Sequence, residues 1–234
     1  MLVALALTAC ESNQERSAKL EKAAERHKGE AAQHRALAQR ALTITRQSTK
    51  VKVIDTSLVR GSEGTAAVVT LRNVSNTPLR DVPVQIDVRN ARGVSVYTND
   101  VAGLSPTLVS VALLPAHTVL TWIDDQVQAS GVPTSVSAKV GEGTPTTGTV
   151  PHLSVQGARV SEAQAEGNVV NRSGIGQQEL VVYALARRAG RIVAAGRAVL
   201  PAVPAGGSTQ FQIFFVGNPA GAQLEVSAPA TTSG

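Results

Sequence analysis

The stretch Leu79-Arg-Asp-Val-Pro-Val-Gln-Ile-Asp-Val-Arg89 decides the fold class, because apolar and polar residues alternate along it. From Val82 to Val88 every second residue is a branched aliphatic, and the residues between them are proline, glutamine and aspartate. Successive side chains of a strand point to opposite faces, so this pattern predicts a strand with one buried and one solvated face. The Asn-Ala-Arg-Gly sequence that follows predicts a turn, with Gly93 where a positive φ is needed.

The same unit occurs twice in the chain. Residues 71–88 align with residues 169–186, so that an Asn-Val-Ser turn at 73–75 falls on an Asn-Arg-Ser turn at 171–173. Further matches between the two copies are Gly93 with Gly190, Pro115 with Pro204, Trp122 with Phe211, and Val-Ser-Ala at 136–138 with the same tripeptide at 226–228. A repeat of short strands about 80 to 95 residues long has the size of an immunoglobulin-like sandwich.

These features predict a mainly β protein with two tandem immunoglobulin-like β-sandwich domains, at residues 51–141 and 152–229. The Gly/Thr/Pro-rich segment 142–151 predicts a linker between them, and residues 230–234 predict a frayed tail. Residues 10–50 are rich in Ala, Glu, Arg and Lys and contain no proline, which predicts an N-terminal α-helical stalk. Its apolar positions are small and sparse, so we expect most of the stalk to be solvated, with its last turns as the part that can dock on the first sandwich.

The two repeats resemble the FxLYD family of bacterial envelope domains. The resemblance rests on the Asn-Ser turn, the central strand, its glycine turn, and the later Leu-Pro turn that leads to an aromatic residue; together these cover most of residues 51–229. The naming motif is degenerate in both copies, as Ile-Asp-Val-Arg-Asn at 86–90 and Ala-Leu-Ala-Arg-Arg at 184–188. The resemblance implies an exported lipoprotein without established catalytic residues.

The N-terminus carries a candidate lipid-attachment site. Residues 1–9 are apolar and too short to span a bilayer, and they end at the single cysteine of the chain. Leu7, Thr8, Ala9 and Cys10 match the lipobox of bacterial lipoproteins. The match predicts that residues 1–9 are the remnant of a signal peptide and that the Cys10 thiol receives acyl chains such as palmitate. The alternative is an inert cysteine in a chance apolar segment.

Charge is unevenly distributed along the chain. The net charge is +4 over residues 11–50, −1 over residues 51–150 and +2 over residues 151–234. The high isoelectric point therefore belongs mainly to the N-terminal segment, which argues against a nucleic-acid groove in a folded domain. The basic residues Arg35, Arg40, Arg46 and Lys50 predict contact with anionic lipid or a wall polymer, the alternative being an ordinary solvated face.

The search for chemistry finds no catalytic, cofactor-binding or metal-binding motif. His27 and His34 lack the HExxH spacing of a zinc site, and Asp100 with Asp124 and Asp125 is a weak calcium pattern. We therefore expect no cofactor and no enzyme, but a cell-envelope lipoprotein that is anchored outside the cytoplasm and binds an envelope protein or has a structural role. An accessory subunit of an exported transporter or secretion complex is the alternative, and a cell-wall enzyme is a third hypothesis.

A candidate interface lies on the central strand of the second copy. The repeat offset places Leu180, Val182, Ala184 and Ala186 toward the core, and Val181, Tyr183 and Leu185 in the places of the polar residues of the first copy. A strand with two apolar faces is usually covered on both sides. The cover could be the first sandwich, the stalk, a second protomer or a foreign protein. A one-residue change of register, which would exchange the two faces, is the competing interpretation.

Overall fold

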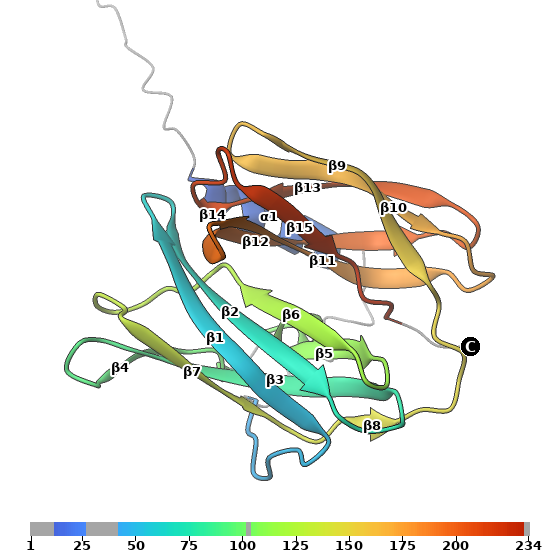
Figure 1. The fold of residues 1–234 in the computed structure, drawn as a ribbon, viewed down its shortest axis with the longest axis horizontal. Helices are drawn as coiled ribbons and strands as arrows, with labels where there is room; N and C mark the ends of the chain where they lie inside the picture. The colour runs from blue at the N-terminus through green and yellow to red at the C-terminus, as the bar shows by residue number, and fades with distance from the viewer. Residues whose placement is uncertain (1–11, 27–41, 102–103, 232–234) are drawn as a thin grey trace, which may run out of the picture.

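The computed structural model describes residues 12–26, 42–101 and 104–231, and it confirms a mainly β protein built from β-sandwiches (Figure 1). The first sandwich lies below the second in Figure 1, and the chain passes once from one to the other. In the described residues every strand pairing falls within one sandwich.

The first sandwich packs the three-stranded sheet β1-β2-β6 against a sheet centred on β3, which pairs with β4, β5, β7 and β8. The strand predicted from alternation is this central strand. Its four branched aliphatics from Val82 to Val88 are fully buried. The strands of this sandwich are β1 (Val51–Gly61), β2 (Gly64–Asn73), β3 (Leu79–Arg89), β4 (Ser95–Thr98), β5 (Ser110–Leu114), β6 (Val119–Asp124), β7 (Ser135–Val140) and β8 (Thr144–Pro145).

The second sandwich repeats this plan, with the sheet β13-β10-β9 against the sheet β14-β12-β11-β15. Its strands are β9 (Leu153–Ser161), β10 (Gln164–Asn171), β11 (Gln177–Arg188), β12 (Arg191–Val203), β13 (Ser208–Phe214), β14 (Val216–Gly217) and β15 (Gln223–Ser227). The two copies differ beside the central strand. β12 is one continuous partner of β11, whereas in the first copy β4 and β5 share this role and the short helix α3 (Pro106–Val109) lies between them.

Strand registers test the alignment of the repeats residue by residue. Trp122 lies opposite Val69 and Phe211 lies opposite Gly167, so the aromatic pair is equivalent in both copies. The match between the two Val-Ser-Ala tripeptides is wrong by two residues. Ile86 pairs with Ala138, and its counterpart Ala184 pairs with Val226, which makes Ala138 equivalent to Val226.

Each Asn-x-Ser turn closes its sandwich in the same way. Asn73 is fully buried, and its side-chain amide donates to the carbonyl oxygens of Thr77 (2.9 Å), Leu114 (3.2 Å) and Pro115 (3.1 Å). Its Oδ1 accepts from the backbone and hydroxyl of Ser75 at 2.9 and 2.8 Å. Asn171, also fully buried, makes the matching bonds with Ser173 and Ile175. The turn therefore recurs because buried backbone groups need these partners.

The N-terminal segment differs from the predicted stalk. Helix α1 (Asn13–Arg26) packs along β12 and β13 of the second sandwich, so its first turns are docked rather than solvated. Residues 42–50 are not helical, and Gln47 forms a bridge with Gly141 while Ser48 caps the start of β1. The run Thr43-Ile44-Thr45 explains this difference, because three β-branched residues in succession disfavour a helix.

Both predicted connecting segments are partly ordered against the sandwiches. β8 lies inside the predicted linker 142–151 and pairs with β3 at Leu79 and Arg80. In the predicted tail, Ala230 is buried, and the Thr231 backbone donates to the side-chain oxygen of Gln177 at 2.7 Å. The cause is the same in both cases. Hydrogen-bonding groups at the end of a strand still need partners, and the adjacent segment of the chain supplies them.

Candidate functional site

Strand β11 has two apolar faces, and both are buried. Leu180, Val182, Ala184 and Ala186 lie in the core of the second sandwich. Val181, Tyr183 and Leu185 are on the opposite face and remain only 5%, 3% and 4% exposed. The structure therefore has the register given by the repeat offset, and the exchanged register is not the one observed.

The face with Tyr183 is covered by the first sandwich of the same chain. Val181, Tyr183 and Leu185 belong to one apolar cluster with core residues of the first sandwich such as Trp122 and Ile123. We call this contact between the sandwiches the seam; β12 and β14 contribute Ala195 and Val216 to it. The seam makes these three side chains an internal contact, so they do not form a free surface for a foreign partner.

Helix α1 lies across the edge of the seam and contacts both sandwiches. Its start is fixed by a capping box: the Ser12 hydroxyl accepts from the Glu15 backbone at 3.1 Å, and the Glu15 carboxylate accepts from the Ser12 backbone at 2.9 Å. The Asn13 backbone donates to Glu63 of the first sandwich at 2.9 Å, and its side chain donates to the carbonyl of Phe215 of the second at 3.4 Å. The first turn of α1 is thus tied to both sandwiches.

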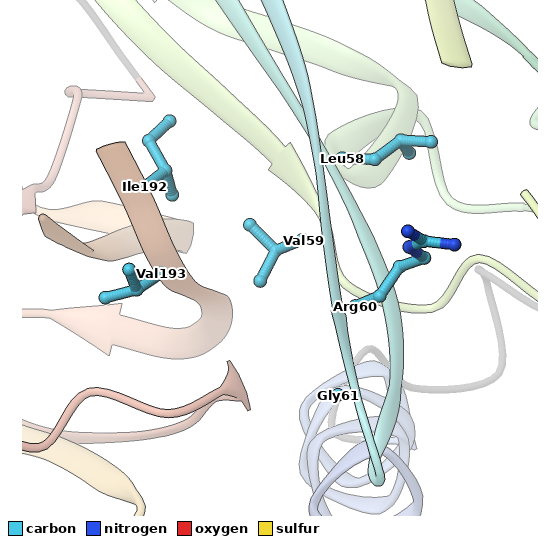
Figure 2. Close-up of a pocket in the computed structure, with 6 residues that line it drawn as sticks. All are labelled: Leu58, Val59, Arg60, Gly61, Ile192 and Val193. Carbon is cyan, nitrogen blue, oxygen red and sulfur yellow. The ribbon is translucent and has the colours of Figure 1, made fainter. Parts of the chain in front are cut away.

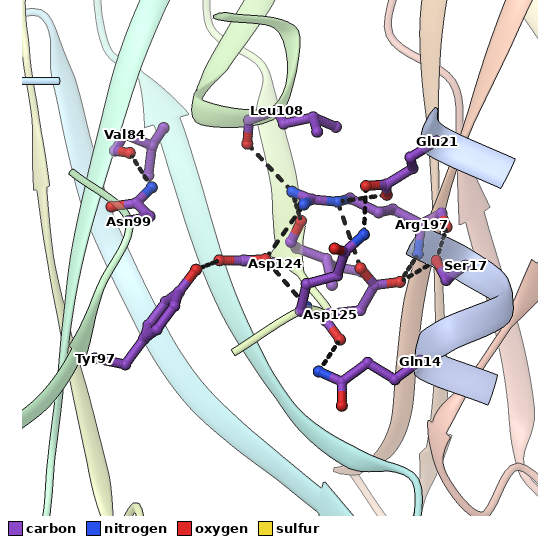
Figure 3. A network of polar contacts seen from close by, with 12 residues as sticks. Gln14, Ser17, Glu21, Val84, Tyr97, Asn99, Leu108, Asp124, Asp125 and Arg197 are labelled. Carbon is purple, nitrogen blue, oxygen red and sulfur yellow. Dashed lines mark hydrogen bonds and ion pairs between the residues drawn. The ribbon is translucent and has the colours of Figure 1, made fainter. Parts of the chain in front are cut away.

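A buried arginine joins α1, the first sandwich and the second sandwich (Figure 3). Arg197 is 4% exposed and projects from β12 on the seam side, the side of Ala195 and Val199. Its guanidinium contacts Glu21 of α1 at 3.0 Å and Asp124 of β6 at 3.2 Å, and its Nε lies 3.4 Å from Asp125. It also donates to the carbonyl oxygens of Leu108 (3.2 Å) and Ile123 (3.1 Å).

Further hydrogen bonds extend this network along α1. The Ser17 hydroxyl contacts the Asp125 carboxylate at 3.0 Å and the Arg197 carbonyl at 3.2 Å, while the Arg197 backbone donates to Asp125 at 3.0 Å. The Gln14 side chain donates to the Asp125 carbonyl at 3.1 Å, and Gln126 donates to Glu21. We call Ser17, Glu21, Asp124, Asp125 and Arg197 the latch.

The latch contains more acidic groups than its cation can neutralise. Burial raises the pKa of Glu21 from 4.5 to about 8. The nearby charge of Asp125 adds to this increase, and the charge of Arg197 opposes it. Burial also raises the pKa of Asp125, although Arg197 opposes the effect. Both shifts favour the protonated form of these carboxyl groups, while Arg197 keeps its charge because burial is outweighed by its three acidic neighbours, which raise its pKa.

Two tyrosines border the latch without supplying a reactive group. The Tyr97 hydroxyl donates to Asp124 at 2.7 Å, and burial together with that carboxylate raises the pKa of Tyr97. Burial likewise raises the pKa of Tyr183. Both phenols therefore stay protonated. The hydrogen bonds and ion pairs of the latch hold the two sandwiches and α1 in place relative to one another.

A shallow groove of about 560 Å³ lies where β1 ends beside the start of β12 (Figure 2). Val59 points from β1 toward Ile192 and Val193, while Leu58 and Arg60 lie on the other side of the strand. Val59 is buried in the seam cluster, and Ile192 packs partly against it. The groove is thus the open margin of the seam, lined mainly by aliphatic side chains and glycine.

The other residues singled out from the sequence do not form a common site in the described part of the chain. Leu7, Thr8, Ala9, Cys10, Arg35, Arg40, His27 and His34 lie outside the described residues. Arg46 forms an ion pair with Glu142 at 2.9 Å, and Lys50 precedes β1; both lie at the end of β1 opposite Glu63. Asp124 and Asp125 are buried against Arg197, whereas Asp100 bonds to Gln85 and Thr98.

No group of three or more potential metal ligands forms within the described part of the chain. The same residues include no helix long and apolar enough to cross a membrane.

Sequence reasoning missed the latch. The first of two signals lies in β12, where Arg197 stands between the apolar residues Ala195 and Val199 on one face of the strand. A single charge on an apolar strand face needs a buried partner of opposite charge. A second signal was the Ser-Asn-Gln-Glu capping box at 12–15, which marks where α1 begins.

No family model matches this chain, and no curated protein is significantly similar to it.

Proposed function

We propose that this protein is a non-enzymatic lipoprotein of the bacterial cell envelope, anchored through acyl chains on Cys10, with two FxLYD-type sandwiches that form one binding or structural unit. The lipobox at Leu7–Cys10 supports the anchor. The observation that carries the proposal is the position of α1, which begins at the Ser12 cap directly after this motif and is tied to both sandwiches.

The latch supports a scaffold role for the two sandwiches. Its carboxylates bond to Arg197, Ser17 and Tyr97, which are contacts that hold elements together. The apolar face of β11 is used in the seam, so an envelope partner has to bind elsewhere. A protein anchored in this way presents both sandwiches to its surroundings as a single body.

Acylation is tested by expressing the full chain, behind a lipoprotein signal peptide, in bacteria fed a labelled fatty acid. We expect the wild-type protein to take up the label and to fractionate with membranes, and Cys10→Ser to lose both properties. Thr8→Ser is the matched control, because it keeps a small residue in the lipobox and should behave as the wild type. An unlabelled wild type, together with Cys10→Ser still bound to membranes, contradicts the anchor.

A further inference from the structure

The start of α1 marks one end of the molecule, which we call the proximal end. It comprises the first turn of α1 and four connections of the sandwiches, at residues 61–64, 90–94, 131–134 and 188–191. In Figure 1 this is the left end, where the β1–β2 turn, β14 and the start of α1 lie.

Direct contacts link the connections of the proximal end. Asn13 of α1 bonds to Glu63 in the first connection, and Arg60 beside it donates to the Pro133 carbonyl at 3.1 Å. The Thr134 backbone donates to the Arg89 carbonyl at 2.8 Å, which brings the 131–134 loop to the β3–β4 turn. The Arg188 side chain bonds to the Ala220 carbonyl in the loop that follows β14.

We infer that the proximal end lies against the lipid surface and touches its headgroups. The inference rests on the proposed anchor at Cys10. Only Glu11 separates Cys10 from the Ser12 cap, and two residues of chain span at most about 7 Å. A tether this short cannot let the body turn its other end to the bilayer while α1 stays docked.

The proximal end carries basic and apolar side chains that can contact lipid headgroups. Arg92, Arg188 and Arg191 are exposed there and can meet phosphate groups. Val94 and Val132 are 56% and 69% exposed and can enter the interfacial region. Arg46 and Lys50 lie at the other end of β1, which is 11 residues long and therefore spans roughly 33 Å. With α1 docked, this orientation keeps those two residues away from the anchoring bilayer, which leaves contact with a wall polymer or an ordinary solvated face.

Exposed valines at the opposite end provide matched controls. Val74 and Val119 are 45% and 53% exposed, near the β2–β3 and β5–β6 turns. Because both ends carry such residues, surface composition does not choose between them, and the orientation follows from the tether alone. A pair of labels, one at each end, therefore reports the orientation directly.

The experiment uses acylated full-length protein reconstituted into vesicles of phosphatidylcholine and phosphatidylglycerol that contain a lipid quencher. Acylation consumes the Cys10 thiol, so Val132→Cys or Val74→Cys provides one thiol for an environment-sensitive fluorophore. We expect several-fold stronger quenching and a blue-shifted emission for the label at 132 than for the label at 74. Equal quenching at the two positions, or stronger quenching at 74, overturns the orientation.

A spacer variant tests whether the short tether is the cause. A flexible Gly/Ser insert of about 30 residues between Glu11 and Ser12 has a mean span of roughly 30 Å, and it should reduce the quenching difference severalfold. Flotation of the labelled proteins with vesicles is scored separately. Failure of the wild type to float contradicts the anchor and the orientation with it, whereas flotation with equal quenching contradicts the orientation alone.

Discussion

At the scale of single residues, Arg197 is the group on which the arrangement depends most. It contacts carboxylates from α1, from β6 and from the residue after β6, and each of these is buried. A buried pair adds little net stability compared with an apolar replacement, but removal of one partner leaves charges that cannot be solvated. The latch is therefore better understood as a device that specifies where α1 docks.

Replacement of Arg197 by methionine is expected to lower the free energy of unfolding by about 3–5 kcal/mol, because the buried acidic groups of the latch lose their only cation. Urea denaturation measures the change. Arg191→Met on the same strand is the matched control, since Arg191 is exposed and should change stability by less than about 0.5 kcal/mol. Equal effects of the two substitutions would contradict the role of Arg197.

The raised pKa of Glu21 predicts a pH dependence of α1 docking. Its pKa is raised from 4.5 to about 8 when α1 is docked, so the docked state retains a proton that the undocked state loses. Docking is therefore strongest below pH 4.5, weakens as the pH rises toward 8, and levels off above that value. The groups that face Glu21 are Arg197, Asp124 and Asp125.

Thermal denaturation across this pH window measures the effect. The melting temperature of the wild type should fall as the pH rises, and Glu21→Gln should flatten this trend because glutamine does not titrate. An equally steep trend in Glu21→Gln would assign the dependence to another group.

At the scale of elements, β11 shows what the repeat alignment can and cannot establish. The offset between the copies correctly predicts which residues of β11 face the core, because it carries the clear alternation of β3 over to a strand whose own two faces are both apolar. The same reasoning misplaces the Val-Ser-Ala tripeptide of residues 226–228 by two residues, because a shift of two keeps each side chain on the same face and the burial pattern does not detect it. Docking of α1 was not predictable from local pattern, since Glu21 and Arg197 are 176 positions apart.

The seam face of β11 gives a prediction at this scale. Tyr183→Asp should lower the free energy of unfolding by more than about 3 kcal/mol, because it places an unpaired carboxylate in the seam. It should also make residues 146–152 between the sandwiches easier to cleave by a protease. Tyr183→Phe is the control and should stay close to the wild type, since it keeps the buried ring. Unchanged cleavage in Tyr183→Asp would show that the seam does not hold the sandwiches together.

The turn asparagines give a second prediction at the element scale. Asn73→Ala removes the partner of buried carbonyl oxygens and should cost about 1–3 kcal/mol, as should Asn171→Ala in the second sandwich. Asn90→Ala is the control, because Asn90 accepts hydrogen bonds in an exposed turn and should cost less. Chemical denaturation of the three variants makes the comparison, and a larger loss in Asn90→Ala than in Asn73→Ala would contradict it.

At the scale of the whole molecule, the two sandwiches and α1 form a single arrangement with two distinguishable ends. The sequence predicted both sandwiches and the helical start, but it placed the helix in solvent as a stalk. The difference has a physical cause: Ser17 and Glu21, the described side chains of α1 that are buried in the contact, are polar and acidic, so the apolar pattern of the sequence gave no sign of a docking site. With α1 docked, a lipid on Cys10 would hold one chosen end against the membrane.

Docking of α1 is the central claim, and hydrogen exchange of its backbone amides in the full-length protein at neutral pH tests it most directly. The account predicts that the amides of residues 17–22 exchange far more slowly than in a peptide of the same sequence. It also predicts that Arg197→Met makes the exchange of these amides faster. Exchange at the rate of the free peptide in the wild type would show a solvated stalk and would contradict the account.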